Sequence, residues 1–237
     1  VILYGGTYTD GSMTFLTDTW FWRGHTWTRT ATAGPPFVLS KMNITADPLN
    51  GEVVMFRADD SNNHVWFYSG NTWYKQEKAD FKSSGQNVWD ENRKRVVKFI
   101  YSCGATFTNP QSCTWEWNGK KWSKVHDMTQ GDPGPKSKDD NFNLIYDCVN
   151  NKTLLLITDK ATNLRETWSW NGSSWTKLSV TSAPYPQQHA SWACDSSNNR
   201  VVIWDRGMNV WNGTSWSNPA TTGYPNIHNQ RIAYSPI

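Results

Sequence analysis

Hydrophobic and polar residues alternate in a unit that occurs five times along the chain, and each unit contains a hairpin bracketed by tryptophans. The fullest copies read Trp-x-Trp-Asn-Gly-x-x-Trp, with a short aromatic run on each side of the turn. Asn-Gly between two strand-like runs is a strong signal for a tight β-hairpin turn. The five copies are Trp20–Trp27, Trp66–Trp73, Trp115–Trp122, Trp168–Trp175 and Asn209–Trp216.

A second piece of each unit is a polar turn that leads into a short apolar strand. Aliphatic, β-branched and aromatic residues bounded by Asn, Asp and Gly are typical of strands. Another strand, such as Asn141–Tyr146, runs up to the turn, and in four units it ends in an aspartate that can cap backbone amides. The apolar strands are Val1–Tyr4, Val53–Phe56, Val96–Phe99, Leu154–Ile157 and Val201–Trp204, and the aspartates are Asp47, Asp90, Asp147 and Asp195.

Each unit is therefore expected to form four antiparallel strands. The hairpin glycines lie 46, 49, 53 and 41 residues apart, and this period with aromatic strands predicts an all-β fold, a five-bladed β-propeller in one domain, 1–237. The chain opens on a second strand and ends on a lone first strand, Asn229–Tyr234, which we expect to join the N-terminal blade and close the ring. The expected blades are 228–237 with 1–34, 35–80, 81–128, 136–182 and 185–222.

The units resemble the repeats of kelch and galactose-oxidase-like propellers, in particular extracellular bacterial-type repeats. In those repeats the first strand ends in a Tyr-Asp turn, the second ends in Gly-Gly, and the hairpin carries Trp-x-Trp-x-Gly-x-x-Trp. The resemblance covers the whole chain, although only Gly5-Gly6 keeps the paired glycines. It implies that the first strands are innermost and line a central channel. Propellers serve as enzymes, lectins and scaffolds, so function depends on the site.

Composition narrows the class of partner. The 237 residues include 16 tryptophans and carry a net charge of only +3. The longest basic cluster, Arg93–Arg95, is expected in a solvated turn, and no run of Lys or Arg forms a stripe, so nucleic acid is not an expected partner. No apolar run reaches membrane-spanning length, so we expect no membrane insertion. The chain begins inside a predicted strand, and we expect it to be the mature part of a longer protein.

The repeated tryptophans have two explanations. Exposed aromatic rings can stack on sugars, but each repeat must also bury one face against the next. We expect tryptophans at a fixed repeat position to pack between neighbouring blades. Trp89 and Trp192, outside the hairpin motif, align with apolar positions of other units and are expected in the core as well.

The first strand of each unit offers the polar candidates. Side chains alternate between the two faces of a strand, so one register packs between blades while the polar register faces the channel and its mouth. Asn and Gln both donate and accept hydrogen bonds, which suits sugar hydroxyls, and a water-filled channel is the alternative. The predicted ligand-binding residues are Lys41, Asn43, Gln86, Asn141, Asn143, His189, Ser191, Asn229 and Arg231.

The same register contains no aspartate or glutamate, whereas glycosidases need paired carboxylates in the pocket. Asp139 and Asp140 are the only acidic pair near the predicted mouth, and both lie on one blade. The five histidines fall at unrelated repeat positions, which suggests no metal cluster, and nucleophile and phosphate-loop motifs are absent. We therefore expect a non-catalytic protein with no metal and no cofactor.

Four cysteines and four sequons bear on location. Cys103 and Cys113 flank a loop whose ends a hairpin brings together, so we expect a disulfide between them. Cys148 and Cys194 could form a second bridge, and buried thiols are the alternative. An even number of cysteines favours a secreted or cell-surface protein. Asn43 is expected to face the channel and stay bare, and the expected glycosylation sites are Asn151, Asn171 and Asn212.

Three functions follow from this sequence. The first is a binding or adhesion propeller with a glycan or another surface protein as its partner, acting through the channel mouth and three long predicted loops. The second is a self-assembling structural unit of a surface fibre or of a larger surface protein. The third is a degenerate glycosidase-like enzyme. The predicted loops are Thr7–Thr17, Cys103–Cys113 and Gly131–Lys138.

Overall fold

A computed structural model of the protein describes residues 2–10, 12–30, 34–35, 43–57, 64–76, 85–103, 112–128, 132–137, 139, 141–187, 190–204 and 207–220. These residues form antiparallel strands and one short 3₁₀ turn, η1 (Ser196–Asn198). The chain divides into two compact units, Val1–Ser84 and Gly85–Ile237. Within the described ranges, no helix combines the length and the apolar character that crossing a lipid bilayer requires.

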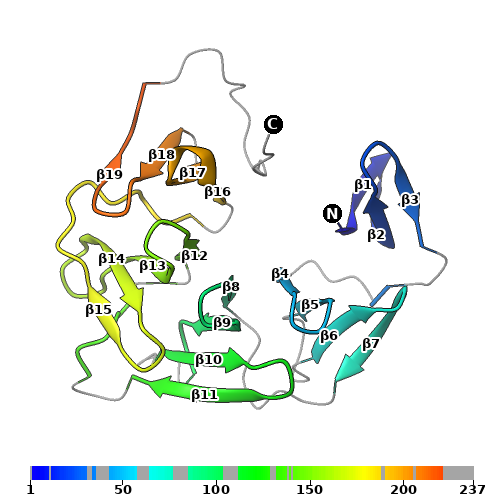
Figure 1. Ribbon diagram of the computed structural model, residues 1–237, viewed down its shortest axis with the longest axis horizontal. Helices are drawn as coiled ribbons and strands as arrows, with labels where there is room; N and C mark the ends of the chain where they lie inside the picture. The colour runs from blue at the N-terminus through cyan, green and yellow to red at the C-terminus, as the bar shows by residue number, and fades with distance from the viewer. Residues whose placement is uncertain are drawn as a thin grey trace. The chain divides into compact units, whose positions relative to one another are not determined.

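The first unit contains two sheets, in which strands that follow each other in sequence pair side by side (Figure 1). Blade 1 has the order β1-β2-β3, and blade 2 has the order β4-β5-β6-β7. The strands are β1 (Ile2–Asp10), β2 (Ser12–Trp22), β3 (Trp27–Arg29), β4 (Asn43–Asp47), β5 (Glu52–Arg57), β6 (His64–Ser69) and β7 (Thr72–Gln76).

The second unit contains three four-stranded sheets of the same kind: blade 3 (β8 to β11), blade 4 (β12 to β15) and blade 5 (β16 to β19). Blade 3 consists of β8 (Gln86–Asp90), β9 (Arg95–Ile100), β10 (Cys113–Trp117) and β11 (Trp122–Asp127). Blade 4 consists of β12 (Asn143–Asp147), β13 (Lys152–Thr158), β14 (Arg165–Trp170) and β15 (Trp175–Lys177). Blade 5 consists of β16 (Ser191–Asp195), β17 (Arg200–Trp204), β18 (Met208–Trp211) and β19 (Trp216–Ser217).

The five antiparallel sheets confirm the predicted number of blades, and blades 2 to 5 have the predicted four strands. Blade 1 has three strands among the described residues. The predicted closing strand, Asn229–Tyr234, lies outside them.

An aspartate turn joins the first two strands of blades 2 to 5, as the sequence predicts. In blade 4, Asp147 accepts hydrogen bonds from the backbone N–H groups of Val149 (2.9 Å) and Asn150 (3.2 Å). The carboxylate thus satisfies backbone donors that the turn exposes. Asp47, Asp90 and Asp195 accept the equivalent backbone bonds in the other three blades.

One predicted loop is wrong. The segment Thr7–Thr17 was expected to be a long loop after a short strand, but β1 continues to Asp10 and β2 begins at Ser12. The two strands stay in register up to the pair Asp10↔Ser12. The segment is rich in Thr, Tyr and Phe, which favour strands, so an extended hairpin replaces the loop.

Blades 1 and 2 pack through aromatic residues. Met55, Tyr68 and Trp73 of blade 2 form a buried cluster against Tyr4 and Phe21 of blade 1. The ring centroids of Tyr4 and Trp73 lie 5.1 Å apart in an edge-on arrangement, which suits the charge distribution of aromatic rings. Tryptophan at the repeat position therefore packs between blades, as predicted.

Blades 3, 4 and 5 pack through two further apolar cores. Between blades 3 and 4 lie Val97 and Phe99 on one side and Leu155 and Trp170 on the other. Between blades 4 and 5, Leu154 and Leu156 meet side chains of β17 and β18. Alternate residues of one strand thus serve opposite neighbours, because successive side chains point to opposite faces.

The last tryptophan of the hairpin also makes a polar contact with the preceding blade. The indole N–H of Trp175 donates to the Thr114 hydroxyl at 2.8 Å, and that of Trp216 donates to Thr167 at 3.0 Å. In the first unit, Trp73 donates to Thr19 at 2.8 Å. A buried indole needs such an acceptor, so the threonine before Trp-x-Trp belongs to the repeat.

Candidate functional site

About half of the predicted ligand-binding residues are described, and these lie at the start of the first strands or just before it. Gln86, Asn143 and Ser191 are the first residues of β8, β12 and β16. Asn43 opens β4 in the same way, with only its backbone described. Lys41, His189, Asn229 and Arg231 lie outside the described residues.

The carboxamide of Gln86 joins blade 3 to blade 4. Its Nε2 donates to the carbonyl oxygen of Phe142, and its Oε1 accepts the backbone N–H of Leu144 at 2.9 Å. These two backbone groups flank Asn143. One side chain therefore holds the start of the neighbouring first strand from both sides.

Asn143 makes the corresponding contact one blade further along. Its Nδ2 donates to the carbonyl oxygen of Gln187 at 2.7 Å, and its Oδ1 accepts the N–H of the same residue at 3.1 Å. A carboxamide can bind a peptide group in this way because it offers one donor and one acceptor side by side. Asn143 is 5% exposed, so both of its polar atoms are used inside the protein.

These two amides act first as clamps between blades. Ser191 at the same position in blade 5 is also buried, and Asn141 is half-buried, with its N–H donating to the Asp139 carboxylate at 2.9 Å. A ligand at this end of the blades would have to displace a clamp or bind other groups. The prediction that these residues bind a ligand stays a prediction.

The acidic pair near the predicted mouth is described only in part, because Asp140 lies outside the described residues. The carbonyl of Asp139 accepts the Ser137 hydroxyl at 2.8 Å, and its carboxylate binds the backbone of Asn141. Asp139 therefore organises its own loop. Within the described ranges, no three His, Cys, Asp or Glu side chains gather in a group that could hold a metal ion.

Tyr185 is a candidate that sequence reasoning missed. Tyr185 is 51% exposed, whereas Pro184 and Pro186 on either side are buried. Two residues further on, Gln187 is held by the clamp of Asn143. Because proline also fixes φ, the ring is displayed on a backbone that is restrained on both sides. The Pro-Tyr-Pro sequence before a first strand was the signal that could have identified it.

Two other exposed aromatic residues, Trp27 and Tyr74, already contact other side chains. The ring of Trp27 lies 5.5 Å from that of Trp22, and Tyr74 stacks on Phe67 at 5.4 Å and donates to Glu52. Among the described residues, Tyr185 has no ring partner and no hydrogen bond through its side chain. It is the aromatic surface best placed to meet a ligand.

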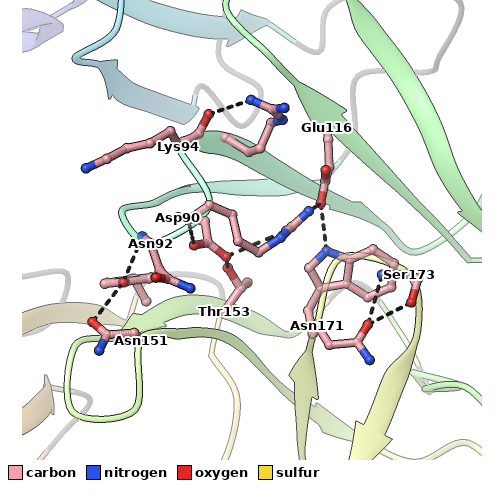
Figure 2. A network of polar contacts seen from close by, with 12 residues as sticks. Asp90, Asn92, Lys94, Glu116, Asn151, Thr153, Asn171 and Ser173 are labelled. Atoms are coloured by element: carbon pink, nitrogen blue, oxygen red, sulfur yellow. Dashed lines mark hydrogen bonds and ion pairs between the residues drawn. The ribbon is translucent and has the colours of Figure 1, made fainter.

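The opposite end of blades 3 and 4 carries a polar network (Figure 2). The guanidinium of Arg93 lies 2.5 Å from the carboxylate of Glu116 and 3.7 Å from that of Asp90. Glu116 also accepts the indole N–H of Trp170 at 2.7 Å, and Thr153 donates to Asp90 at 2.9 Å. Each acid already has a cation or a donor, so the network cross-links two blades.

This network corrects the expectation that the basic turn is solvated. The side chain of Arg93 is only 23% exposed and pairs with Glu116 of its own blade, while Lys94 is 51% exposed and pairs with Glu91. The guanidinium lies against Gly172, where a Cβ would come within 2.8 Å of it. The sequence pattern alone did not distinguish the largely buried Arg93 from the exposed Lys94.

Both predicted disulfides are present. Cys103–Cys113 closes the loop between β9 and β10, with a Cα–Cα distance of 5.9 Å. Cys148–Cys194 connects blade 4 to β16 of blade 5, with a Cα–Cα distance of 6.1 Å. Both distances lie within the normal range for a disulfide. The inner strands of neighbouring blades are therefore close enough to be bridged.

One row of blade 3 departs from the repeat. Asn87 and Lys98 face each other across β8 and β9, where blade 4 has Leu144 and Leu155. Lys98 is fully buried, and burial lowers the pKa of its amine to about 7. The carboxamide of Asn87 is also buried and has no hydrogen-bond partner among the described residues. The row buries polar groups where blade 4 buries two leucines, at a cost in stability.

Comparisons with known proteins give relatives in structure only. No protein-family model and no curated protein matches the chain. The SapL1 lectin, solved in complex with α-methyl fucoside, matches with a TM-score of 0.56 and 12% identity, over 97% of this chain and 84% of that one. The fungal Aleuria aurantia lectin, a six-bladed β-propeller that recognises fucose, matches with a TM-score of 0.55 and 13% identity, over 98% and 83%.

A chain of a nidogen/laminin complex matches with a TM-score of 0.55 and 11% identity, over 89% of this chain and 73% of that one. Likeness at such identities concerns the fold alone, and the same fold hosts different functions. The resemblance to kelch and galactose-oxidase-like repeats stays a prediction. With five sheets in place of the six blades of the fungal lectin, the protein has the fold of a five-bladed β-propeller.

Proposed function

We propose that the protein is a secreted or cell-surface, non-catalytic propeller that binds glycans. The ligand lies at the end of the blades where the first strands begin. The exposed ring of Tyr185 between two buried prolines carries this proposal. An aromatic ring held in place offers an apolar face to the C–H groups of a pyranose without a large loss of side-chain entropy on binding.

Polar groups at the same end complete the proposed site. The clamp of Asn143 on Gln187 fixes the segment that carries Tyr185. Lys41, His189, Asn229 and Arg231 stay ligand-binding residues predicted from sequence, because their side chains suit sugar hydroxyls, and they lie outside the described residues. Gln86, Asn141 and Asn143 then act mainly as positioning residues.

Two further observations support the proposal. The chain shares its fold, over nearly its whole length, with two lectins whose structures concern fucose recognition. The two disulfides suit an oxidising compartment, as expected for a protein that meets glycans outside the cell. Fucosides are therefore the first ligands to test.

A glycan array with the labelled protein tests the function, followed by calorimetric titration of the hits and of α-methyl fucoside. We expect saturable binding to at least one class of glycan and no turnover of it. An array without hits, together with filaments or oligomers of the purified protein, contradicts the proposal and favours the structural alternative.

Variants at Tyr185 test the site. We expect Tyr185→Ala to weaken glycan binding about tenfold, the equivalent of about 1.4 kcal/mol, and Tyr185→Phe to retain it. Leu164→Ala is the matched control, because Leu164 is 61% exposed on a loop of blade 4. If Tyr185→Ala binds as tightly as the wild type, the ligand lies elsewhere on the protein.

A further inference from the structure

Four sequons lie within the described residues, and three of them, in blades 4 and 5, lie at the end of these blades opposite to Tyr185; the fourth, at Asn43, opens β4, and only the backbone of Asn43 is described. Asn151 belongs to the aspartate turn of blade 4, whereas Asn171 and Asn212 lie at the hairpin tips of blades 4 and 5. We propose that the folded protein is an acceptor of N-linked glycans at Asn171 and Asn212 but not at Asn151. This proposal is independent of the proposed function.

The hairpin tips present the whole sequon to solvent. Asn171 and Ser173 are exposed, and the Oδ1 atom of Asn171 accepts both the backbone N–H (2.9 Å) and the hydroxyl (3.0 Å) of Ser173. The asparagine and the hydroxyl of the sequon therefore lie together on one exposed turn, and Figure 2 shows the two side chains facing each other. A transferase can reach both from outside the protein.

The tip of blade 5 repeats this geometry. Asn212 and Thr214 are exposed, and Oδ1 of Asn212 accepts the N–H and the hydroxyl of Thr214, both at 3.0 Å. Gly213 between them has φ +96°, a conformation that favours glycine. Glycine at the middle position of the sequon thus permits the turn, and the side chains of Asn212 and Thr214 remain on the surface.

The sequon of Asn151 is divided between the surface and the core. Asn151 is exposed and its Oδ1 accepts the Tyr146 hydroxyl at 3.3 Å, but Thr153 is 0% exposed. The hydroxyl of Thr153 donates to Asp90 of the preceding blade at 2.9 Å (Figure 2). An enzyme that must engage this hydroxyl has to open the contact between blades 3 and 4 first.

The modification itself is a glycosyl transfer. The C1–O bond of a polyprenyl-diphosphate-linked oligosaccharide breaks and a bond from C1 to the Nδ2 atom of asparagine forms. The amide loses one proton to a base, and the polyprenyl diphosphate leaves. The protein contributes the acceptor amide and the neighbouring hydroxyl.

The test compares the folded chain with the reduced, alkylated and therefore unfolded chain. Each is incubated with a purified oligosaccharyltransferase and the lipid-linked donor, and site occupancy is measured by mass spectrometry of peptides. In the folded protein we expect occupancy at Asn151 at least about tenfold below that at Asn171 and Asn212, because access requires local opening. In the unfolded chain all three sites should be modified.

Blade 3 supplies a matched gain-of-site control. Asn118 lies at the hairpin tip of blade 3, in the position equivalent to Asn171 and Asn212. Its Oδ1 accepts the N–H groups of Lys120 (3.0 Å) and Lys121 (2.9 Å), but position 120 carries no hydroxyl, so there is no sequon. We expect Lys120→Ser to make Asn118 an acceptor in the folded protein. Unmodified Asn171 and Asn212, or equal occupancy of Asn151 in the folded protein, overturns the proposal.

Discussion

The interface between blades 3 and 4 and the interface between blades 4 and 5 use the same three contacts but differ in a fourth. Both have a tryptophan-to-threonine bond, a tryptophan-to-carboxylate bond and an amide clamp. The carboxylate bonds run from Trp170 to Glu116 at 2.7 Å and from Trp211 to Asp147 at 2.8 Å.

At the interface of blades 3 and 4 the fourth contact is indirect: Arg93 pairs with Glu116 of its own blade, and Glu116 accepts the indole N–H of Trp170 from blade 4. Between blades 4 and 5 it is a covalent bond, the disulfide Cys148–Cys194. The repeat therefore fixes how neighbouring blades recognise each other. The additional stabilisation is supplied separately at each interface.

Removing the disulfide between blades 4 and 5 should have the largest effect. Loop-closure entropy for the 46-residue separation of Cys148 and Cys194 predicts a loss of about 4 kcal/mol on replacing both by serine, against about 3 kcal/mol for Cys103 and Cys113, which are 10 apart. Urea unfolding of the two double variants measures both values. The reverse order would mean that unfolded-state entropy does not govern the difference.

Replacing Lys98 in blade 3 by an apolar residue should abolish a pH dependence of the stability of the protein. Blade 4 has leucines in the equivalent row and contributes no such dependence. The buried amine of Lys98 has a pKa of about 7 against an ordinary 10.5, so above pH 7 the unfolded state binds more protons than the folded state. Stability should therefore rise with pH, by about 2–3 kcal/mol over two pH units above 7.

The variant Lys98→Met tests this difference, because blade 2 has the buried Met55 in the equivalent row. We expect Lys98→Met to be the more stable protein at pH 7 and to lose the rise, measured by urea unfolding from pH 7 to 9. A wild-type curve parallel to that of the variant would show that the amine stays protonated in the folded state.

Removing a polar contact at an aspartate turn should cause the next largest loss of stability. Arg93→Ala leaves Glu116 buried without its cation and should cost about 2 kcal/mol. The equivalent residue of the next turn, Asn150, donates to the carbonyl of Gly213 at 2.7 Å, and Asn150→Ala should cost about 1 kcal/mol. Thermal unfolding of both variants gives the ranking, and equal losses would mean that the ion pair adds nothing to a neutral hydrogen bond.

Removing a tryptophan-to-threonine hydrogen bond should cause the smallest loss of stability, and the loss should be similar at the two interfaces. Thr114→Val and Thr167→Val each leave a buried indole N–H without its acceptor, at about 1 kcal/mol. Blade 2 already has Val65 at this position, so valine fits the blade sterically. The serine variants are the controls and should retain the bond. A large difference between Thr114→Val and Thr167→Val would break the equivalence of the two interfaces.

Patterns that recur in every unit predicted most of the fold. The hairpins, the aspartate turns and the packing of tryptophan between blades follow from local sequence, because each depends on neighbours at a fixed spacing. Cys103–Cys113 belongs to the same class, since the hairpin that brings the two residues together lies between them.

Contacts between residues far apart in the sequence were harder to predict. Gln86 and Asn143 were placed at the correct end of their strands, but their backbone partners depend on how far apart neighbouring blades lie. Arg93 looked like a surface cation because its partner Glu116 is on another strand. Tyr185 was missed because nothing in the repeat marks it. Side chains that depart from a repeat have to be judged from their surroundings.

The four described aspartate turns share one length, and so do the five hairpin tips. Five positions separate the paired residues at each aspartate turn, Asp47↔Glu52, Asp90↔Arg95, Asp147↔Lys152 and Asp195↔Arg200. The same spacing holds at each tip, Trp22↔Trp27, Tyr68↔Trp73, Trp117↔Trp122, Trp170↔Trp175 and Trp211↔Trp216. Among the described residues, this end of each blade therefore keeps one length, so gene duplication could diversify the connections at the other end without altering how the blades fit together.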